Sequence, residues 1–265
     1  MLQSTFVFLK GNGESTERCL WEAGIRNWHD FLASSSLPGI ATARKNLYDE
    51  YMYHLLAEYQ QGNFRFFARC LKPRDHWRLF DTFRTRTVFL DIETTGEPAG
   101  IGYVTLVGLY ANGQTTTLIR NETLTADRLE SELSRYDLIV TFFGTSFDVP
   151  YLRTTFPTLR IDHAHFDLCF AARRLGLRGG LKHIEQELGL ARSANIQGLD
   201  GWDAVRLWRA WENGQTEAKA LLCDYNEADV RNLEPLAEHL YAMLRERSGF
   251  VSPYQPSVRK TRSAG

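Results

Sequence analysis

Five side chains in three short motifs have the types and spacing needed for metal-dependent phosphate chemistry. Asp91 and Glu93 lie in FLDIETTG, Asp148 lies in GTSFDVPYL, and Tyr225 and Asp229 lie in CDYNEADV. Mg²⁺ and Mn²⁺ prefer hard oxygen ligands, so a site for these ions is built from carboxylates and water. Two such cations, roughly 3.5–4 Å apart, stabilise the attacking and the leaving oxygen of an in-line displacement at phosphorus. The carboxylates and the phenol therefore predict a two-metal phosphodiesterase site.

The first pair of acids falls at the end of a predicted strand. Residues 87–92 (TVFLDI) are β-branched and apolar, which is typical of a strand. Alternation along the strand places Asp91 and Glu93 on the face of Phe89, opposite the face of Leu90. Because an unpaired buried charge is costly, two acids on one face of a buried strand indicate a partner or a metal.

The other motifs lie on predicted helices. Asp148 follows a predicted strand at 137–142 and lies where a helix opens near Pro150. Tyr225 and Asp229 are four residues apart in a helical stretch, so they share one face. Each residue also has an ordinary explanation, since Asp148 can cap a helix and a packed phenol followed by a surface acid is common. The joint occurrence of the three motifs favours the site.

The three motifs in this order resemble the DEDDy 3′–5′ exonuclease family of the ribonuclease-H-like superfamily. The stretches FLDIETTG, FGTSFDVPYL, RGGLKHIEQELG and DYNEADVRNLEPLAEHL resemble its YprB-type ribonuclease-H-like domain branch. The resemblance implies a metal-dependent 3′–5′ exonuclease that hydrolyses phosphodiester bonds of DNA or RNA, acting on single-stranded 3′ ends. Two alternatives stay open: a structure-selective endonuclease on the same site, and a nucleic-acid-binding scaffold whose catalysis has decayed.

The resemblance also implies a role for each residue of the motifs. Asp91 bridges two divalent cations, Mg²⁺ or Mn²⁺. Glu93 and Asp229 complete one metal site, and Asp148 reaches the second through water. Tyr225 orients the attacking water, because a phenol with a reference pKa of about 10 is a hydrogen-bonding group rather than a strong base.

Five further residues are expected to contact the substrate. By resemblance, Thr94 and Thr95 border the terminal nucleotide, and Phe147 is expected beside them. Arg178 and Lys182 flank a glycine pair at the start of a predicted helix, where free N–H groups and the helix dipole favour an anion. A plain turn between helices that needs glycine explains the same residues equally well.

One position departs from the family pattern. The family usually carries an Asn at the end of the strand that precedes its second motif, and this chain has Phe143 there. Because Asp148 itself is intact, we expect metal binding to survive and the rate and substrate preference to change. Nearby, Asp167 is predicted to cap a helix, and His163 and His165 lack the third ligand that a zinc site requires.

Residues 65–86 form a basic and aromatic segment. It contains seven Lys and Arg residues against two acidic residues, with aromatic residues between them. This composition suits contact with a phosphate backbone and stacking on bases. The alternative is that the rings pack onto the main domain. The rings in question are Phe64, Phe66, Phe67, Trp77, Phe80 and Phe83.

The composition is that of a globular protein. The chain has 265 residues, of which 43% are apolar and 24% charged, enough to bury a core. It has no run of 18 apolar residues and no signal-peptide pattern, so we expect no membrane association. Its four scattered cysteines suit reduced thiols, which predicts a cytoplasmic enzyme.

The order of elements predicts an α/β fold with a ribonuclease-H-like mixed β-sheet flanked by helices. A small, mostly helical region at 1–85 precedes this domain at 86–249, and a flexible tail follows at 250–265. A meander of antiparallel strands followed by β-α-β crossovers is typical of this fold. Strands are expected at 87–92, 101–110, 114–120, 137–142 and 163–167, and helices at 125–135, 146–155, 168–175, 180–189, 201–212 and 216–246. The last helix is expected to kink or break near Pro235.

Overall fold

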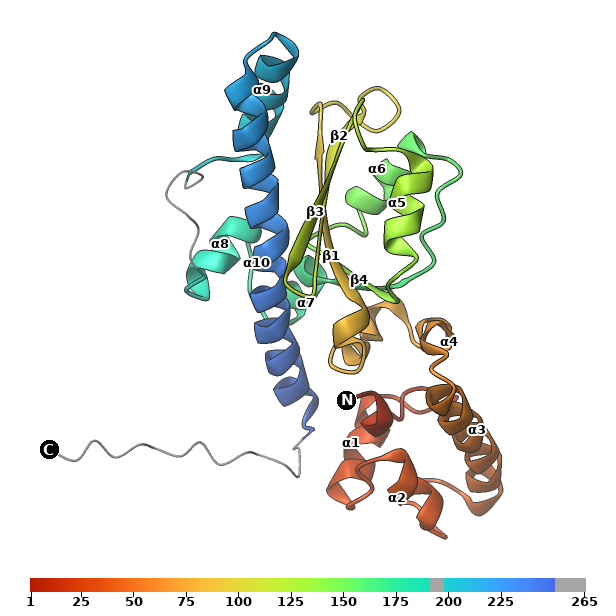
Figure 1. The fold of residues 1–265 in the computed structure, drawn as a ribbon. Helices are drawn as coiled ribbons and strands as arrows, with labels where there is room; N and C mark the ends of the chain where they lie inside the picture. Colours follow the sequence, from red (N-terminus) through yellow and green to blue (C-terminus); the bar gives the residue numbers. More distant parts are fainter. Residues whose placement is uncertain (191–197, 251–265) are drawn as a thin grey trace, which may run out of the picture.

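A five-stranded mixed sheet lies at the centre of the larger part of the protein (Figure 1). The computed structural model describes residues 1–190 and 198–250, so the predicted tail beyond Phe250 lies outside the described residues. The strand order is β3-β2-β1-β4-β5, with β1, β2 and β3 antiparallel and with β4 and β5 parallel to β1. The strands are β1 Thr87–Thr94, β2 Val104–Ala111, β3 Gln114–Ile119, β4 Leu138–Thr141 and β5 Ala164–Asp167. The predicted fold class is therefore confirmed.

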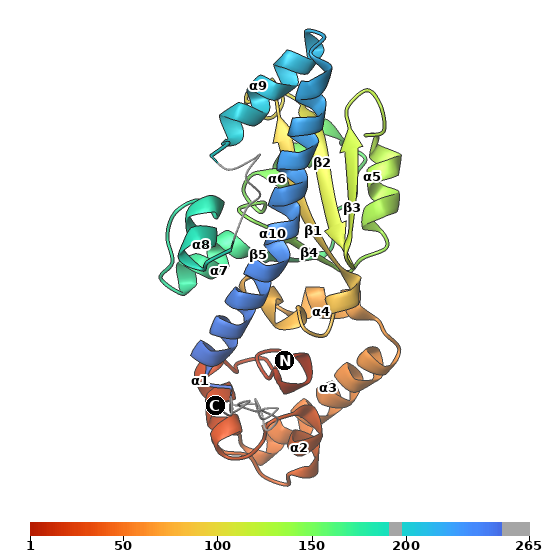
Figure 2. The ribbon, with the colours of Figure 1, turned by 60° about the vertical axis from the view of Figure 1, so that its left-hand side comes forward.

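Helices cover both faces of this sheet (Figures 1 and 2). α5 and α6 pack on the face that carries Leu90, whereas α7 and α10 cover the face that carries Phe89. The alternation predicted along β1 is confirmed, because the two sets of side chains belong to different hydrophobic clusters. The helices of this part are α5 Ala126–Leu133, α6 Asp148–Thr155, α7 Leu168–Arg174, α8 Leu181–Glu187, α9 Gly201–Glu212 and α10 Thr216–Ser248.

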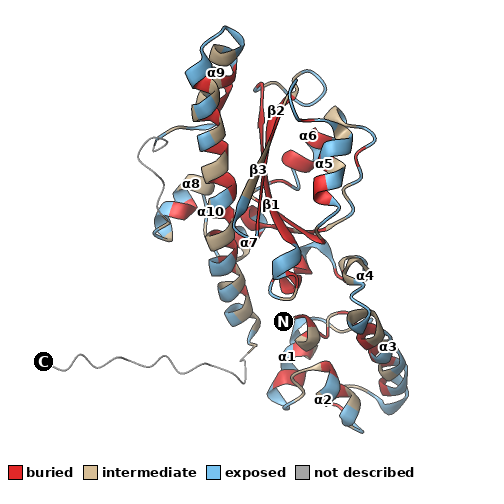
Figure 3. Cartoon of the chain, in the orientation of Figure 1, coloured by how far each residue is buried: buried red, intermediate tan, exposed pale blue. Residues whose placement is uncertain are grey.

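The last helix, α10, runs for 33 residues and continues through Pro235. The predicted break at this proline is wrong, and a kink there stays a prediction. A proline inside a helix removes one backbone hydrogen bond, but Leu233, Leu236 and Leu240 on either side of it are buried against the sheet. Packing of this face keeps the helix continuous, and Figure 3 shows the buried residues of α10 alternating with exposed ones. No helix within the described ranges combines the length and apolarity needed to cross a membrane.

The first 86 residues are mostly helical, as expected. They form α1 Glu14–Glu22, α2 Trp28–Ala33, α3 Thr42–Gln60 and α4 Phe64–Cys70, together with the 3₁₀ helices Leu2–Ser4, Pro73–Leu79 and Arg84–Arg86. Their core continues into the α/β domain. Trp77 packs 6.0 Å from Tyr241 of α10, and Phe80 packs 5.7 Å from Phe166 of β5, measured between ring centroids. The two regions therefore share one hydrophobic core.

The rings of the basic and aromatic segment at 65–86 pack into the protein, which was the alternative to base stacking. Four rings of this segment are buried, so the hypothesis that these four stack on bases is wrong; they are Phe67, Trp77, Phe80 and Phe83. Phe64 and Phe66 are half-buried and pack against the same core. Several of the basic side chains pair with acids of the same molecule: Arg65 and Arg86 pair with Asp137, and Arg84 pairs with Glu238. This segment attaches the helical region to the sheet.

A buried ion pair in this shared core gives a test of its contribution to stability. Nη1 of Arg78 lies 2.8 Å from Oε2 of Glu17, and both side chains are 1% exposed. Burial raises the pKa of Glu17 even though Arg78 opposes the rise. Because removing one partner leaves the other charge buried and unpaired, we expect Arg78→Met to lower the free energy of unfolding by about 3–5 kcal/mol in urea denaturation.

The matched control is Arg231, which pairs with Glu227 on the exposed surface of α10. Arg231→Met should cost less than about 1 kcal/mol, because exposed pairs are screened by water. Equal and small losses in both variants would contradict the proposed difference.

Candidate active site

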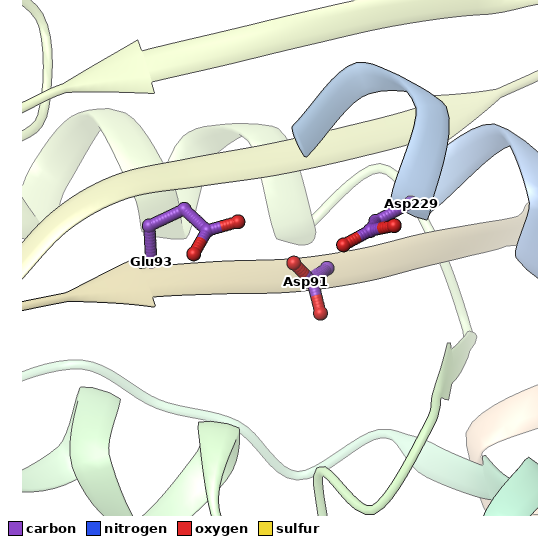
Figure 4. A group of neighbouring side chains, drawn as sticks. All are labelled: Asp91, Glu93 and Asp229. Carbon is purple, nitrogen blue, oxygen red and sulfur yellow. The ribbon is translucent and has the colours of Figure 1, made fainter. Parts of the chain in front are cut away.

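Three acids from two distant segments meet on the α10 face of the sheet. Asp91 and Glu93 come from β1 and Asp229 comes from α10 (Figure 4). One carboxylate oxygen of each lies within 4.8 Å of the others. Glu93 and Asp229 are buried and Asp91 is half-buried. The structure thus brings together three of the four acids that the sequence singled out as metal ligands.

A buried asparagine donates hydrogen bonds to two of these acids. Asn226 is fully buried, and its Nδ2 donates to Oδ2 of Asp91 at 2.9 Å and to Oε1 of Glu93 at 3.4 Å. The space for its amide comes from Gly108, which pairs with Asp91 across the β1–β2 ladder. A Cβ at Gly108 would lie 2.0 Å from Oδ1 of Asn226.

Sequence reasoning missed both residues of this contact. A glycine inside a strand is a signal for close approach of another segment, and Gly108 in VTLVGLYA gave that signal. The signal for Asn226 was its spacing, three residues before Asp229 on the same helical face.

The acids repel one another when all are charged. Burial raises the pKa of Glu93 well above its usual range, and the charge of Asp229 raises it further. The hydrogen bond from Asn226 opposes the rise. A cation would relieve this repulsion. Because the group offers carboxylate oxygens alone, its donor set fits a hard divalent ion such as Mg²⁺ or Mn²⁺.

Asp148 lies near this group but outside it. It is the first residue of α6 and is buried. Burial raises its pKa to about 7, while a backbone hydrogen bond at Ile92 of β1 opposes the rise. Its charge in turn adds to the rise in the pKa of Glu93, so the two carboxyls interact. A contact from Asp148 to a second cation through water stays a prediction.

The turn between β4 and α6 fixes the position of Asp148. Asp167 caps α7 as predicted, accepting from the Cys169 N–H at 3.0 Å. The same carboxylate also accepts from the N–H groups of Phe143 and Thr145, each at 2.9 Å. Asp167 therefore joins the turn to the start of α7, a function that the cap alone did not predict.

Phe143 occupies a strained position in this turn. Its φ is 69°, in the left-handed region that favours glycine and asparagine. A bulky residue held there costs about 1–3 kcal/mol. An Asn, which the resemblance predicts at this position, would adopt this conformation with less strain, so Phe143 keeps the backbone shape of the turn at a cost.

Tyr225 and Lys182 contact each other beside the acids. The Tyr225 hydroxyl accepts a hydrogen bond from Nζ of Lys182 at 3.0 Å, and this ammonium lies 4.7 Å from the centroid of the ring. Lys182 stands in the first turn of α8, after the glycine pair as expected. The predicted phenol and the predicted anion-binding cation are thus one contact pair.

A cleft of about 320 Å³ opens over the acids, and aromatic side chains border it. Phe147, from the turn before α6, and Trp202, from the first turn of α9, both line it and are exposed. Thr94 lines the same cleft. A neighbouring cavity of about 290 Å³ reaches from Asp91 to Lys182. Sequence reasoning missed Trp202, since nothing in GLDGWDAV marks its ring as exposed.

Two of the predicted substrate contacts lie elsewhere. The Thr95 hydroxyl accepts a hydrogen bond from the Tyr103 N–H at 3.2 Å and faces the 96–103 loop. A Cβ at Gly102 would lie 2.5 Å from this hydroxyl, so Thr95 packs against that loop. Arg178 is exposed in the connection between α7 and α8 and does not line the cleft.

A larger cavity of about 460 Å³ contains histidines but has the wrong chemistry for this site. Burial lowers the pKa of His165 to about 4, and its Nε2 lies 2.8 Å from the Thr141 hydroxyl. His76 accepts from the His165 N–H at 2.9 Å. His163 bonds the carbonyl of Leu133 through Nε2. Burial lowers the pKa of each of these rings, and their hydrogen bonds connect structural elements.

The strand order and the acids at the end of the central strand define a ribonuclease-H-like α/β domain. A family model described as the RNase_H superfamily matches residues 88–241. This match covers more than half of the chain, so the chain belongs to the RNase_H superfamily. The residues predicted for the site lie within the matched range. The DEDDy subtype and the YprB-type branch stay predictions.

Several solved structures are similar to the chain at low sequence identity. The family B DNA polymerase from the hyperthermophilic archaeon Pyrobaculum calidifontis is 17% identical, with a TM-score of 0.48 over 58% of this chain and 24% of the polymerase. Brucella melitensis NrnC is 23% identical, with a TM-score of 0.46 over 65% of this chain and 79% of its own. Escherichia coli RNase D, an exoribonuclease involved in structured RNA processing, is 18% identical, with a TM-score of 0.46 over 66% and 44%. The chain spans less than half of the polymerase and of RNase D. No curated protein matches its sequence.

Asp148 predicts a pH dependence of stability in the metal-free protein. Its pKa of about 7 in the folded state lies above the usual 3.8. Between about pH 4 and pH 7 the folded protein therefore binds more protons at this carboxyl than the unfolded chain does, and the free energy of unfolding falls as pH rises through that window. Buried histidines, whose pKa is lowered by burial, act in the opposite sense. The informative quantity is therefore a difference between variants.

In EDTA, raising the pH from 5 to 8 should lower the urea midpoint of the wild type relative to that of Asp148→Asn. The substitution removes the titrating carboxyl and keeps its shape. Parallel pH profiles for the two proteins would show that Asp148 titrates near its ordinary value.

Proposed function

We propose that this protein is a metal-dependent 3′–5′ exonuclease of the DEDDy type, in the YprB-type branch, that hydrolyses phosphodiester bonds of DNA or RNA. The observation that supports it is the group of Asp91, Glu93 and Asp229, within 4.8 Å of one another in a cleft that also contains Tyr225. Carboxylates crowded at this distance repel one another, and the burial of Glu93 and Asp229 makes their charged forms costly. A divalent ion bound to the phosphate of a substrate would offset the repulsion between these carboxylates.

In this proposal, each residue acts on a bound strand end. Asp91, Glu93 and Asp229 would hold one ion, and Asp91 with Asp148 would serve a second. Divalent cations in such a site lower the pKa of bound water and neutralise charge that develops on phosphate oxygens. The amide of Asn226 fixes the direction in which the carboxylates of Asp91 and Glu93 point.

Tyr225 orients the attacking water. Its hydroxyl is held in place by the hydrogen bond from Lys182 and by the burial of its ring. An oriented phenol places a water at the correct angle without removing its proton, since the reference pKa of tyrosine is about 10. The ammonium of Lys182 also contributes positive charge next to the acids, where a phosphate would lie.

The exposed rings that border the cleft hold the terminal nucleotide. Phe147 and Trp202 offer two apolar surfaces near the acids, and bases stack on such rings with little dependence on sequence. Thr94 borders the same space. A single-stranded 3′ end fits this arrangement because its last base is free to leave the stack.

A pair of labelled oligonucleotides tests the proposal. The protein is incubated in Mn²⁺ with one strand labelled at its 3′ end and one labelled at its 5′ end. We expect the 3′ label to be released first as a mononucleotide, and the 5′-labelled strand to shrink as a ladder. Discrete internal cuts would assign an endonuclease on the same site, and binding without products would assign a scaffold.

Substitution of the acids tests the assignment of metal ligands. Asp91→Ala, Asp148→Ala and Asp229→Ala should each lose nearly all Mn²⁺-dependent hydrolysis while staying folded. Because each change also relieves clustered negative charge, the melting temperature of the metal-free protein should hold or rise. The control is Asp224→Ala, which removes an exposed acid one residue from Tyr225. Full activity of Asp91→Ala would falsify the two-metal assignment.

The Tyr225→Phe variant separates positioning of water from binding of substrate. If the hydroxyl orients water, kcat should fall by about 10²-fold or more, with little change in affinity for the oligonucleotide. Single-turnover rates and fluorescence anisotropy measure the two quantities. A loss of affinity as large as the loss of rate would make Tyr225 a substrate contact.

A further inference from the structure

We infer that Phe143, Phe170 and Arg173 form a stacking platform for a base of the substrate strand upstream of the terminal nucleotide. The inference rests on the proposed function and adds a second nucleotide-binding position to it. The platform lies on the surface formed by the β4–α6 turn and α7, next to the cleft that contains the acids.

The first observation is an exposed pair of rings. Phe143 is 38% exposed and Phe170 is 39% exposed, and their centroids are 6.1 Å apart with an interplanar angle of 39°. Large apolar side chains are normally buried. Two neighbouring exposed rings therefore form an apolar surface of a size that suits a planar ligand.

The second observation is the charge on this surface. The guanidinium carbon of Arg173 lies 5.7 Å from the centroid of Phe143 and 5.5 Å from that of Phe170. Within the described part of the chain, no carboxylate lies at ion-pair distance from Arg173. A cation beside two rings matches a nucleotide, which offers a base to the rings and a phosphate to the cation.

The third observation is the strained backbone beneath the ring. Phe143 stands at φ 69°, where asparagine or glycine would fit without strain. Its N–H is bound by Asp167, and its carbonyl accepts from the N–H groups of Ser146 and Phe147, so the conformation is imposed by the turn. Strain of this kind collects at functional sites. The ring at position 143 is therefore retained at a cost in stability.

The β4–α6 turn that carries Phe143 also contributes two residues to the site. Phe142, directly before Phe143, lines the cavity that contains Asp91, Lys182 and Tyr225. Phe147, at the other end of the same turn, lines the cleft over the acids. In this arrangement, the last phosphodiester of the nucleic-acid strand lies at the acids. The strand then passes Lys182, and an upstream base stacks on Phe143.

The experiment compares a single-stranded octanucleotide with a dinucleotide as substrates in Mn²⁺. In the proposed arrangement the dinucleotide occupies the cleft and does not contact the platform. The measured quantity is kcat/KM for the octanucleotide divided by kcat/KM for the dinucleotide. Stacking of one base accounts for about a tenfold change or more, so Phe143→Asn should lower this ratio about tenfold.

The same substitution should raise the melting temperature, because Asn fits the left-handed conformation better than Phe does. Phe143→Trp keeps an aromatic surface and should keep the ratio. Arg173→Gln should reduce the slope of log affinity against log salt by about 0.7 for the octanucleotide. The matched control is Tyr53→Asn, which removes an exposed ring on α3. It should change neither the ratio of kcat/KM values nor the salt slope.

Two results would overturn the platform. One is an unchanged ratio in Phe143→Asn, and the other is an equal loss for both substrates, which would mean that the turn itself was disturbed. If the wild type hydrolyses neither substrate, the proposed function fails. Anisotropy of a fluorescent octanucleotide still decides the platform in that case, since Phe143→Asn must weaken its binding about tenfold relative to wild type and Tyr53→Asn must not.

Discussion

The crowding of three carboxylates under α10 is the constraint on which the site depends. Asp91 and Glu93 leave β1 on the face that α10 covers, and Asp229 approaches them from the helix. Like charges in a buried place need both a donor and a counter-ion. Asn226 supplies the donor, and it reaches the strand because Gly108 has no side chain. The helix thus lies close enough to the sheet for one ion to contact acids from both.

Such a close approach requires that α10 be held along its length. Its first half carries Tyr225, Asn226 and Asp229, and its second half carries the leucines that pack on the sheet and on the helical region. Tyr241 contacts Trp77 and Phe80 of that region. The first 86 residues therefore support the site indirectly, because they pack against the far end of the helix that carries Asp229.

Much of this arrangement could be predicted from local patterns. Period-two alternation placed Asp91 and Glu93 together, helical spacing placed Tyr225 with Asp229, and the strand-then-helix pattern identified Asp167 as a cap. What could not be predicted depends on packing between distant segments. Asn226 acquires its role only when β2 passes beneath it, and the basic segment at 65–86 binds acids such as Asp137 that lie far along the chain. Spacing within a motif carries no information about either contact.

Phe143 shows how one such position joins stability to function. The turn needs a left-handed residue because Asp167 binds two of its N–H groups at once, and this requirement holds whichever side chain is present. Asparagine would meet it with less strain than phenylalanine does. A phenylalanine keeps the same backbone and adds an exposed ring next to Phe170 and Arg173. Because Asp148 follows five residues later, at the start of α6, the side chain at position 143 stands on the turn that positions this acid.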